Sequence, residues 1–503
     1  MKKRIKGQQL WLCLKQLYMG LAGFLKGTFL RLFLLYRLMS RREKLILAFL
    51  LATLFVTLTI KARAYYCQLT TEVPAEGGIY SEALFGQPKY INPILAVSKG
   101  DKTLCNLIYA GLLSLNNQNQ ATLELAESYQ ISEDKKSYTF RLKPNLVWHD
   151  NKPFSAEDVA YTIYTIKDPA QKSPLYSNFK DVEVEIVDNL TIKFNLANSY
   201  GPFLTSLNFG IIPAGKTLAE LNTKPIGLGA YHYISSQTKS SKVEKIILER
   251  FDQYFGKQPY LQRVEFGYYG SYEDAKSLYE QEEYGAFPYN FNRVNADLKS
   301  YDTSAKIFLL FNLRQEPFSN KDLRLALKNN QKLENEQLFK ITVIDNPELV
   351  AAADQFKERV AEYNFKVEVV VLKENDYKEK INQRDYQALI IGIDFGHDFD
   401  PYPLWHSSQI ESGMNLAGFT SKESDIILED ARLINDPAAR QEKYAQFNQI
   451  VENEALQIKL SEKKFYLSID KKYKNVILDG ALTAAEHLKN INNWYIKTKR
   501  VRK

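Results

Sequence analysis

The feature that most constrains the fold is an uncharged run of sixteen residues, Leu45 to Ile60, bounded by Lys44 and Lys61. As a helix the run would be roughly 24 Å long, slightly shorter than the ~30 Å hydrocarbon core of a bilayer. The flanking lysines can extend toward the lipid headgroups, and Tyr65–Tyr66 is suited to the membrane interface. The run therefore predicts one membrane crossing with a separately folded part beyond it.

The charge distribution predicts which side of the membrane each part occupies. Residues 1–44 contain eleven Lys and Arg and one Glu, whereas the rest of the chain contains 55 basic and 58 acidic residues. Because basic flanks stay in the cytoplasm, residues 1–44 are expected inside and the chain beyond about residue 64 outside. Lys15, Lys26 and Arg37 recur every eleven residues, which indicates a basic amphipathic helix on the inner leaflet. The outer part lacks the basic excess of a nucleic-acid-binding domain, so no nucleic-acid partner is expected.

Two other interpretations of the apolar run remain open. Ala62-Arg63-Ala64 has the spacing of a signal-peptide cleavage site, although 44 residues is a long stretch before an apolar signal region. A lipid anchor on Cys67 would require small residues where Tyr65–Tyr66 stands. We favour an uncleaved anchor, and all three interpretations place the folded part outside the cytoplasm. Cys67 and Cys105 could pair or stay free.

The outer part alternates between strand and helix patterns. Apolar spacing predicts a strand over 79–84, an amphipathic helix over 102–115 and a hairpin over 182–196. Residues 155–166 (SAEDVAYTIYTI) are expected to form a helix capped by the Ser hydroxyl. Between 340 and 393 the pattern becomes β-α-β-α-β, which predicts a parallel sheet with right-handed crossovers.

Residues 210–217 (GIIPAGKT) match the phosphate-binding pattern G-x-x-x-x-G-K-[ST]. That motif requires a buried strand before the loop and a long helix after it. The following TLAELNT provides barely two turns before Lys224-Pro225, so we interpret the string as an ordinary loop. Since no other catalytic or metal motif is present, we expect no enzymatic activity, catalytic residue or cofactor.

Several longer strings occur together in one order. They are LAESYQISEDKKSYTFRLKPNLVWHDNKPFSAEDVAYTI (125–163), PIGLGAYHY (225–233) and NLAGFTSKESDIILEDARLINDP (415–437). This ordered set resembles the extracytoplasmic solute-binding proteins of family 5, the oligopeptide- and dipeptide-binding components of ABC importers. The resemblance covers roughly residues 76–500.

The resemblance implies an α/β, class II periplasmic-binding-protein fold, with two lobes and an extra subdomain, preceded here by one transmembrane helix. Such proteins trap ligand between the lobes by hinge closure. The implied partners are a peptide or peptide-like ligand and the permease subunits of an ABC transporter. The expected boundaries are a basic cytoplasmic segment at 1–44, an anchor at 45–64, a linker at 65–78, lobe I at 79–103, 212–306 and 470–503, the subdomain at 104–211 and lobe II at 307–469.

Residues 396–408 (GHDFDPYPLWHSS) follow the last strand of the β-α-β-α-β run, where open α/β sheets bind their ligands. In peptide-binding members of the resembling family an acidic residue four positions before the equivalent of Pro401 pairs with the ligand's ammonium. Here His397 occupies that position. Either Asp394 or Asp398 takes over this role, or the ligand is not an ordinary peptide.

Other roles for this string remain open. A metal ion could be held by His397, Asp398 and His406, although the loose spacing makes this the minor alternative, and no metal site is expected. Asp400-Pro401 is expected to shape the loop rather than to touch ligand. Trp405 could stack on ligand or pack in the core.

The resemblance further implies that the backbone of the loop after the first strand and of Asp394–His397 pairs with an extended ligand as an added strand. The expected ligand-binding residues are Gln87, Pro88, Tyr90, Asp394, Phe395, Gly396, His397, Asp398 and Trp405. The alternatives are the same fold binding a sugar or a metal chelate, or a surface sensor without a transport role.

Overall fold

The structure is a computed structural model that describes residues 37–116, 120–240, 242–397, 399–411 and 413–503. The predicted basic amphipathic helix within 1–44 and residue Asp398 therefore lie outside the described residues, apart from the stretch 37–44. The chain divides into two compact units, one that ends at Val73 and includes Thr498–Lys503, and one that spans Pro74–Lys497.

The first unit contains α2 (Arg41–Leu69), the one helix among the described residues that is long and apolar enough to cross a membrane. Its 29 residues correspond to roughly 44 Å. None of its side chains is buried within the protein. Ser40 begins the helix, where its backbone N–H donates to the Glu43 carboxylate at 2.8 Å. The length and composition of α2 fit a membrane anchor or a signal sequence.

The predicted linker at 65–78 has regular structure. Helix α2 continues to Leu69, and β1 (Thr70–Ala75) then pairs with β18 (Lys497–Arg502) in a two-stranded ribbon. The Lys503 N–H donates to the Leu69 carbonyl at 3.0 Å. The local sequence could not reveal this strand, because its hydrogen-bond partner lies more than 400 residues away. Cys67 and Cys105 are both free thiols.

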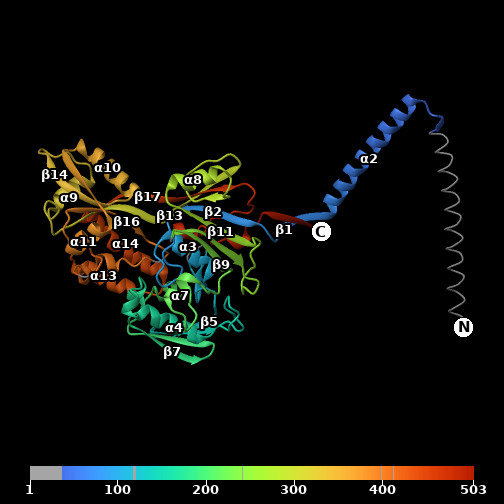
Figure 1. Ribbon diagram of the computed structural model, residues 1–503. Coiled ribbons are helices and arrows are strands. Elements are labelled where there is room, and N and C mark those ends of the chain that lie inside the picture. Colours follow the sequence, from blue (N-terminus) through green and yellow to red (C-terminus); the bar gives the residue numbers. More distant parts are fainter. Residues whose placement is uncertain (1–36, 117–119, 241, 398, 412) are drawn as a thin grey trace. The chain divides into compact units, whose positions relative to one another are not determined.

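A ten-stranded sheet runs through the second unit. Its centre is the long antiparallel pair β13–β17, and the two ends of the sheet form separate lobes on either side of that pair (Figure 1). In spatial order the strands are β15 (Phe365–Leu372), β14 (Gln337–Ile344), β16 (Ala388–Asp394), β13 (Ala296–Phe311), β17 (Gln457–Asp470), β12 (Ala286–Phe287), β2 (Ile79–Phe85), β11 (Arg263–Tyr269), β10 (Lys242–Arg250) and β9 (Tyr231–Lys239).

We call the part built on β14–β16 and helices α9–α14 the far lobe, and the part built on β2 and β9–β12, with residues 86–230 and 471–497, the near lobe. The predicted boundary between residues 306 and 307 falls inside β13, and that between 469 and 470 falls at the end of β17. Both strands belong to both lobes, so no single residue separates the lobes there. A subdomain over 104–211 stays a prediction.

The far lobe has the predicted β-α-β-α-β arrangement. Strands β14, β15 and β16 are parallel. Phe356 and Val360 of α10 pack into one core cluster, and Leu428 of α13 and Phe447 of α14 pack into another. Helix α10 lies on one side of the far-lobe strands, and α13 and α14 lie on the other (Figure 1). The far-lobe helices are α9 (Lys321–Lys328), α10 (Pro347–Ala361), α11 (Glu374–Gln383), α12 (Tyr402–Trp405), α13 (Lys422–Leu433) and α14 (Pro437–Asn453).

The near lobe adds a four-stranded antiparallel sheet and several short helices. The predicted hairpin over 182–196 is confirmed as β7–β8, and the predicted helix that begins at Ser155 is confirmed as α4. At its start the Ser155 N–H donates to the Asp158 carboxylate at 2.9 Å. The elements are α3 (Lys99–Ile108), β3 (Leu113–Leu115), β4 (Ala121–Leu123), β5 (Ala126–Ile131), β6 (Ser137–Leu142), α4 (Ala156–Lys167), α5 (Tyr176–Phe179), β7 (Val182–Asp188), β8 (Thr191–Leu196), α6 (Phe203–Ser206), α7 (Leu218–Thr223) and α8 (Tyr272–Glu280).

The helix predicted over 102–115 was wrong in its second half. Helix α3 ends at Ile108, and Leu113–Leu115 form strand β3. The backbone between them is hydrogen-bonded to distant segments: the Ala110 carbonyl accepts from Ile211 N–H at 2.9 Å and the Gly111 carbonyl accepts from Leu125 N–H at 3.1 Å. These long-range bonds replace the intrahelical bonds that the apolar spacing suggested.

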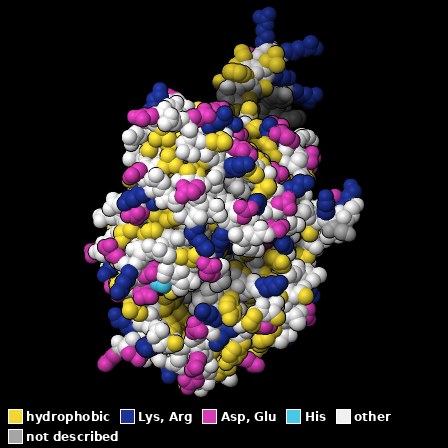
Figure 2. All heavy atoms as spheres, turned by 90° about the vertical axis from the view of Figure 1, so that its left-hand side faces the viewer, with side chains coloured by type: hydrophobic (Ala, Val, Ile, Leu, Met, Phe, Trp, Pro, Cys, Tyr) yellow, Lys and Arg dark blue, Asp and Glu magenta, His cyan; other side chains and the backbone are white. Residues whose placement is uncertain are grey.

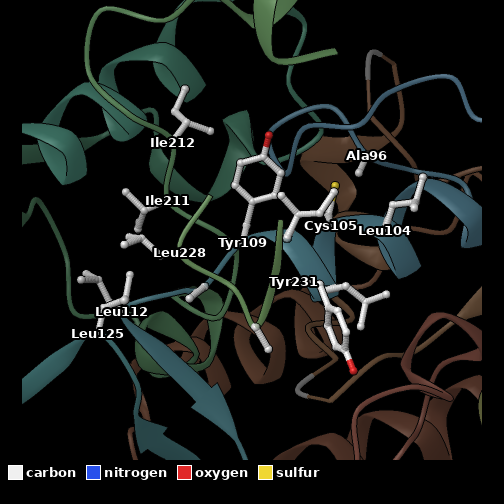
Figure 3. Packing of buried hydrophobic residues seen from close by; sticks show 14 of the residues in the cluster. Ala96, Leu104, Cys105, Tyr109, Leu112, Leu125, Ile211, Ile212, Leu228 and Tyr231 are labelled. Carbon is white, nitrogen blue, oxygen red and sulfur yellow. The ribbon is translucent and has the colours of Figure 1, made fainter. Parts of the chain in front are cut away.

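The GIIPAGKT string is a crossover loop whose residues 211–213 are buried. Ile211 and Ile212 pack in the near-lobe core beside Tyr109 (Figure 3). The amides that a phosphate would need are already bonded within the protein: Ile212 N–H to the Thr162 hydroxyl at 3.1 Å and Ala214 N–H to the Asp158 carboxylate at 2.8 Å. The helix that follows, α7, has six residues.

His149, in the string 125–163, forms hydrogen bonds to the backbone of the string 225–233. Gly227 N–H donates to its Nδ1 at 3.2 Å, so Nε2 carries the proton and donates to the Gly229 carbonyl at 3.0 Å. A Cβ on Gly227 would lie 1.9 Å from the Ile108 carbonyl oxygen, so the turn requires glycine there. Burial lowers the pKa of His149 to about 4.

The surface carries both signs of charge. On the face shown in Figure 2, acidic and basic side chains are interspersed over both lobes. This mixture is what the near balance of 55 basic and 58 acidic residues beyond residue 44 predicts.

The protonation of His149 predicts a pH dependence of stability. The unfolded chain binds a proton at this residue below its ordinary value of 6.5, and the folded chain only below about 4, so stability falls as pH decreases between these values. We expect a loss of about 2–3 kcal/mol across this window. His149→Gln should flatten this part of the profile in urea unfolding, whereas Lys152→Gln, in the adjacent exposed turn, should retain it. An unchanged profile in His149→Gln would contradict the assignment.

Candidate functional site

A cavity of about 860 Å³ lies between the two lobes. Its near-lobe wall comes from α3, from β3 and β4, and from residues 483–492, and its far-lobe wall comes from Asp394–His397. The volume falls within the range of small-ligand sites, and such sites occur where two lobes meet. This cavity is our candidate functional site.

The far-lobe wall lies at the carboxyl end of β16, where the sheet position predicted it. Gly396 N–H donates to the Asp394 carboxylate at 3.1 Å, and the Ser304 hydroxyl donates to the same oxygen. The Phe395 ring packs against Phe308, with 5.9 Å between ring centroids. The structure thus brings four predicted residues, Asp394 to His397, together at the cavity.

The near-lobe wall around residues 483–492 is held by a buried hydrogen-bond network. His487 Nε2 lies 3.0 Å from the carboxylate of Glu82 on β2, and both side chains are almost completely buried. The Tyr80 hydroxyl donates to the same Glu82 oxygen at 2.8 Å. Thr103 on α3 donates to the Ala485 carbonyl at 3.2 Å. Together these bonds hold the segment against α3 and the central sheet.

His397 connects the two walls. Its Nε2 contacts the carboxylate of Glu486 on the near-lobe wall. The other Glu486 oxygen accepts the N–H groups of Leu482 at 2.8 Å and Thr483 at 3.1 Å. Burial alone would raise the pKa of Glu486, but the bond to His397 and these two amides outweigh it and hold the pKa below the ordinary value. Because Nε2 of His397 already contacts the Glu486 carboxylate, that nitrogen is not available to a ligand in this arrangement.

A second contact between the lobes forms at Gly201. Its N–H donates to the Arg432 carbonyl at 2.6 Å, and Asn435 donates to the Tyr138 hydroxyl at 3.3 Å. A Cβ at Gly201 would lie 1.9 Å from the Ile434 carbonyl oxygen. The backbones of the two lobes therefore approach as closely as glycine permits, which indicates a closed arrangement.

Four charged residues of the near-lobe wall were missed by the sequence analysis: Glu486, described above, and Lys102, Lys489 and Glu124. Glu124 accepts the Gly111 N–H at 3.1 Å, and burial raises its pKa to about 7 although Gly111 and Lys143 act against this shift. Lys489 donates to the Gly480 carbonyl at 2.9 Å. No local sequence signal marks these residues, because isolated charges in alternating segments are usually solvated.

The other predicted site residues that the structure describes, Gln87, Pro88, Tyr90 and Trp405, are not among the residues that line this cavity. Gln87 pairs with the backbone of Val243, donating to its carbonyl at 2.9 Å and accepting its N–H at 2.8 Å. Pro88 and Tyr90 lie in the same loop and do not line the cavity. Trp405 is buried in the far-lobe core beside Phe447, because apolar residues of the helices enclose its indole. A ligand role for these residues stays a prediction.

The two described histidines of the metal alternative have different carboxylate partners. His406 stacks on Tyr402, with 4.1 Å between ring centroids, and lies 3.2 Å from the Glu429 carboxylate, whereas His397 points to Glu486. Within the described part of the chain, no three His, Cys, Asp or Glu residues are grouped to hold a metal ion. Asp400 accepts the Tyr402 N–H at 3.0 Å, the loop-shaping role expected for it.

Comparison with known proteins supports one family. Residues 120–329 match the family described as bacterial extracellular solute-binding proteins, family 5 (middle part). This match and the relatives below support family 5, the solute-binding proteins of ABC transporters, as the family that the chain resembles. The chain has the α/β, class II periplasmic-binding-protein fold.

Relatives within family 5 differ in how much of the chain they match. The glutathione-binding protein GsiB of Pectobacterium atrosepticum is 28% identical over 269 residues, 50% of this chain and 51% of that protein. The chain therefore spans about half the length of that relative. The oligopeptide-binding protein AppA of Bacillus subtilis is 23% identical over 472 residues, 75% of this chain and 84% of that protein.

Solved structures of the family share the fold. The ABC transporter substrate-binding protein CtaP of Listeria monocytogenes superposes with a TM-score of 0.72 at 24% identity, covering 84% of this chain and 99% of that chain. The family match and the shared fold together make the interlobe cavity the natural ligand site to test.

Gly201 allows a direct test of the closed contact. We expect Gly201→Ala to force the lobes apart locally, because the new Cβ would overlap the Ile434 carbonyl. Hydrogen–deuterium exchange should then accelerate in peptides covering 199–201 and 432–436. Gly100→Ala is the control, since nothing lies within 4 Å of its added Cβ. Unchanged exchange at both segments in Gly201→Ala would contradict the contact.

Glu124 gives a second test, in the absence of any ligand. The pKa of Glu124 is about 7 in the folded chain and close to its ordinary value of 4.5 in the unfolded chain. The free energy of unfolding therefore falls as pH rises from 4.5 to 7, because the buried carboxyl must lose its proton. Glu124→Gln keeps an acceptor for Gly111 N–H and removes the charge. We expect it to raise the free energy of unfolding by roughly 1–3 kcal/mol at pH 8 and by little at pH 4.5. Equal destabilisation at both pH values would contradict this account.

Proposed function

We propose that the chain is a single-pass, membrane-anchored receptor outside the cytoplasm that captures short peptides and delivers them to an ABC permease. The observation that carries this proposal is the closed interlobe cavity, bordered by Asp394–His397 at the carboxyl end of β16. Peptide as the ligand class is supported by the relatives AppA, named for oligopeptide binding, and GsiB, named for glutathione binding. ATP hydrolysis would take place in separate transporter subunits.

Helix α2 supports the anchoring part of the proposal. It is exposed along its length, and the basic residues that precede its apolar run favour a cytoplasmic N-terminus. A tethered receptor would stay near its permease without a separate lipid anchor. The described part of α2 continues directly into the β1–β18 ribbon, which would stand just outside the bilayer.

The cavity walls suggest how a peptide would be held. Asp394 ends strand β16 and Phe395 follows it, at the position where an extended ligand could add as a strand. The Gly396 N–H is already bonded to Asp394 and Ser304, so the ligand would pair with other backbone groups of this segment. Phe395 and Tyr109 supply apolar surface, and the side chains of Asn106, Ser114 and Asn208 supply polar groups for the ligand backbone. A site that reads mainly backbone atoms would accept varied side chains.

Ligand-dependent stabilisation tests the proposed substrate class. We expect di- to octapeptide pools to raise the unfolding temperature of the full chain by a few degrees, because a ligand at 100 times its Kd adds about 2.7 kcal/mol of stability. The measurement is thermal unfolding in detergent with peptide pools, sugars and metal chelates tested side by side. No shift with any peptide pool, together with a shift for a sugar or a metal chelate, would replace peptide by that ligand class.

Transport is distinguished from sensing by uptake. Cells that contain the chain and its permease should accumulate a radiolabelled peptide that binds the purified chain, and cells lacking the chain should not. Binding without any difference in uptake would favour a surface sensor instead.

Fractionation tests the proposed topology. We expect the full chain to remain in the membrane pellet after a carbonate wash, and a variant lacking residues 45–60 to leave it. Protease added to intact cells, or to spheroplasts if an outer membrane is present, should degrade the part beyond residue 64. Survival of that part under conditions that degrade a known extracytoplasmic control would contradict the topology.

A further inference from the structure

The interlobe cavity contains three described carboxylates, and they differ in their partners. Asp394 accepts from the Ser304 hydroxyl and the Gly396 amide, and Glu486 is bonded to His397 and two amides. Glu124 has one hydrogen bond, from the Gly111 amide to one oxygen, and no ion pair with a described residue. Its second oxygen accepts no hydrogen bond from the described residues and remains available to a ligand in the cavity.

Burying a charged carboxylate in a closed cavity costs folding free energy unless a cation pairs with it. Burial has already moved the pKa of Glu124 to about 7, and the nearby Lys143 is too weak an influence to restore the ordinary value. A ligand cation beside Glu124 would stabilise its charged form. A cationic ligand group would therefore interact more favourably with Glu124 than with Asp394 or Glu486, which already have partners.

The opposite charge lies at the other end of β3. Lys489 donates to the carbonyls of Gly480 at 2.9 Å and Asn116 at 3.4 Å, which leaves its third ammonium hydrogen for another acceptor. Lys102 on α3 also lines the cavity and forms no side-chain hydrogen bond or ion pair with a described residue. Asn106, one helical turn from Lys102, donates to the Ala485 carbonyl at 3.4 Å, so both lysines belong to the α3 and 483–492 side of the cavity.

We propose that Glu124 binds the terminal ammonium, and Lys489 with Lys102 the terminal carboxylate, of a short zwitterionic peptide of three to five residues. The proposal rests on the proposed function and specifies its substrate class. The length follows from β3, because Gly111 beside Glu124 and Asn116 beside Lys489 are five residues apart, at most about 17 Å of extended chain. An extended peptide advances ~3.3 Å per residue, so three to five residues bridge the two charged ends.

This arrangement assigns the ammonium to the near lobe. His397, which the sequence analysis placed at the position of an ammonium-binding acid, is engaged with Glu486. The nearby Asp394 is engaged with Ser304. The unpaired acid lies across the cavity, on the segment that follows β4.

The test uses trialanine and tetra-alanine, each with free ends, with an acetylated N-terminus and with an amidated C-terminus. Their binding to the full chain in detergent is measured by calorimetry at pH 7.5. We expect acetylation and amidation each to weaken binding at least tenfold. Glu124→Gln should weaken binding of the free-ammonium peptide at least tenfold and leave the acetylated peptide almost unaffected. Lys489→Gln should show the same selectivity for free carboxylate over amide.

Two further variants separate the possible outcomes. Glu127→Gln, three residues from Glu124 and exposed on β5, serves as the matched control and should bind like the unmodified chain. Asp394→Asn tests the competing ammonium site, and loss of selectivity there instead of in Glu124→Gln would overturn the proposal. If unmodified trialanine and tetra-alanine bind but acetylation has no effect, this inference fails while the proposed function stands. If no peptide of any length or terminal group binds, the proposed function itself fails.

Discussion

The rest of the structure depends on the pairing of β13 with β17, two long strands that run through both lobes. Near-lobe residues pair in register from Ala296 with Asp470 to Asp302 with Lys464, and the register then shifts so that Lys306 pairs with Glu462. Residues 303–305 lie within this shift. Because the two halves of the sheet are continuous only through these strands and β12, a bend at the shift would move one lobe against the other.

The same shift connects the two walls of the cavity. Ser304 N–H donates to the Leu482 carbonyl at 2.7 Å, and its hydroxyl donates to Asp394. Leu482 begins the segment that carries Glu486, and Asp394 begins the far-lobe loop that carries His397. A single residue at the irregular point of the central strands thus contacts the starting points of both walls. These bonds hold the starting points of both walls near the contact between His397 and Glu486.

The sequence predicted the elements whose signals are local. The far-lobe β-α-β-α-β run, the helix that begins at Ser155 and the hairpin turning at Asp188 each depend on neighbouring residues, and each formed as expected. The end of α3, the β1–β18 ribbon and the near-lobe wall depend on partners about 100 to more than 400 residues away. Glu124 and Lys489 illustrate the limit for the site, since neither carries a motif and only the fold brings them to one cavity. His397 was correctly located at the sheet edge, but its partner Glu486 could not be read from the chain.

The central claim is that ligand is enclosed by closure of two lobes about β13 and β17. The most direct measurement is the distance between spin labels at Glu133 in the near lobe and Glu423 in the far lobe, by pulsed electron resonance on the full chain with Cys13 and Cys67 replaced and Cys105, which is buried, retained. Our account predicts a broad or longer distance distribution without ligand that contracts to one short distance when a binding peptide is added. An identical distribution with and without saturating peptide would contradict hinge closure as the means of capture.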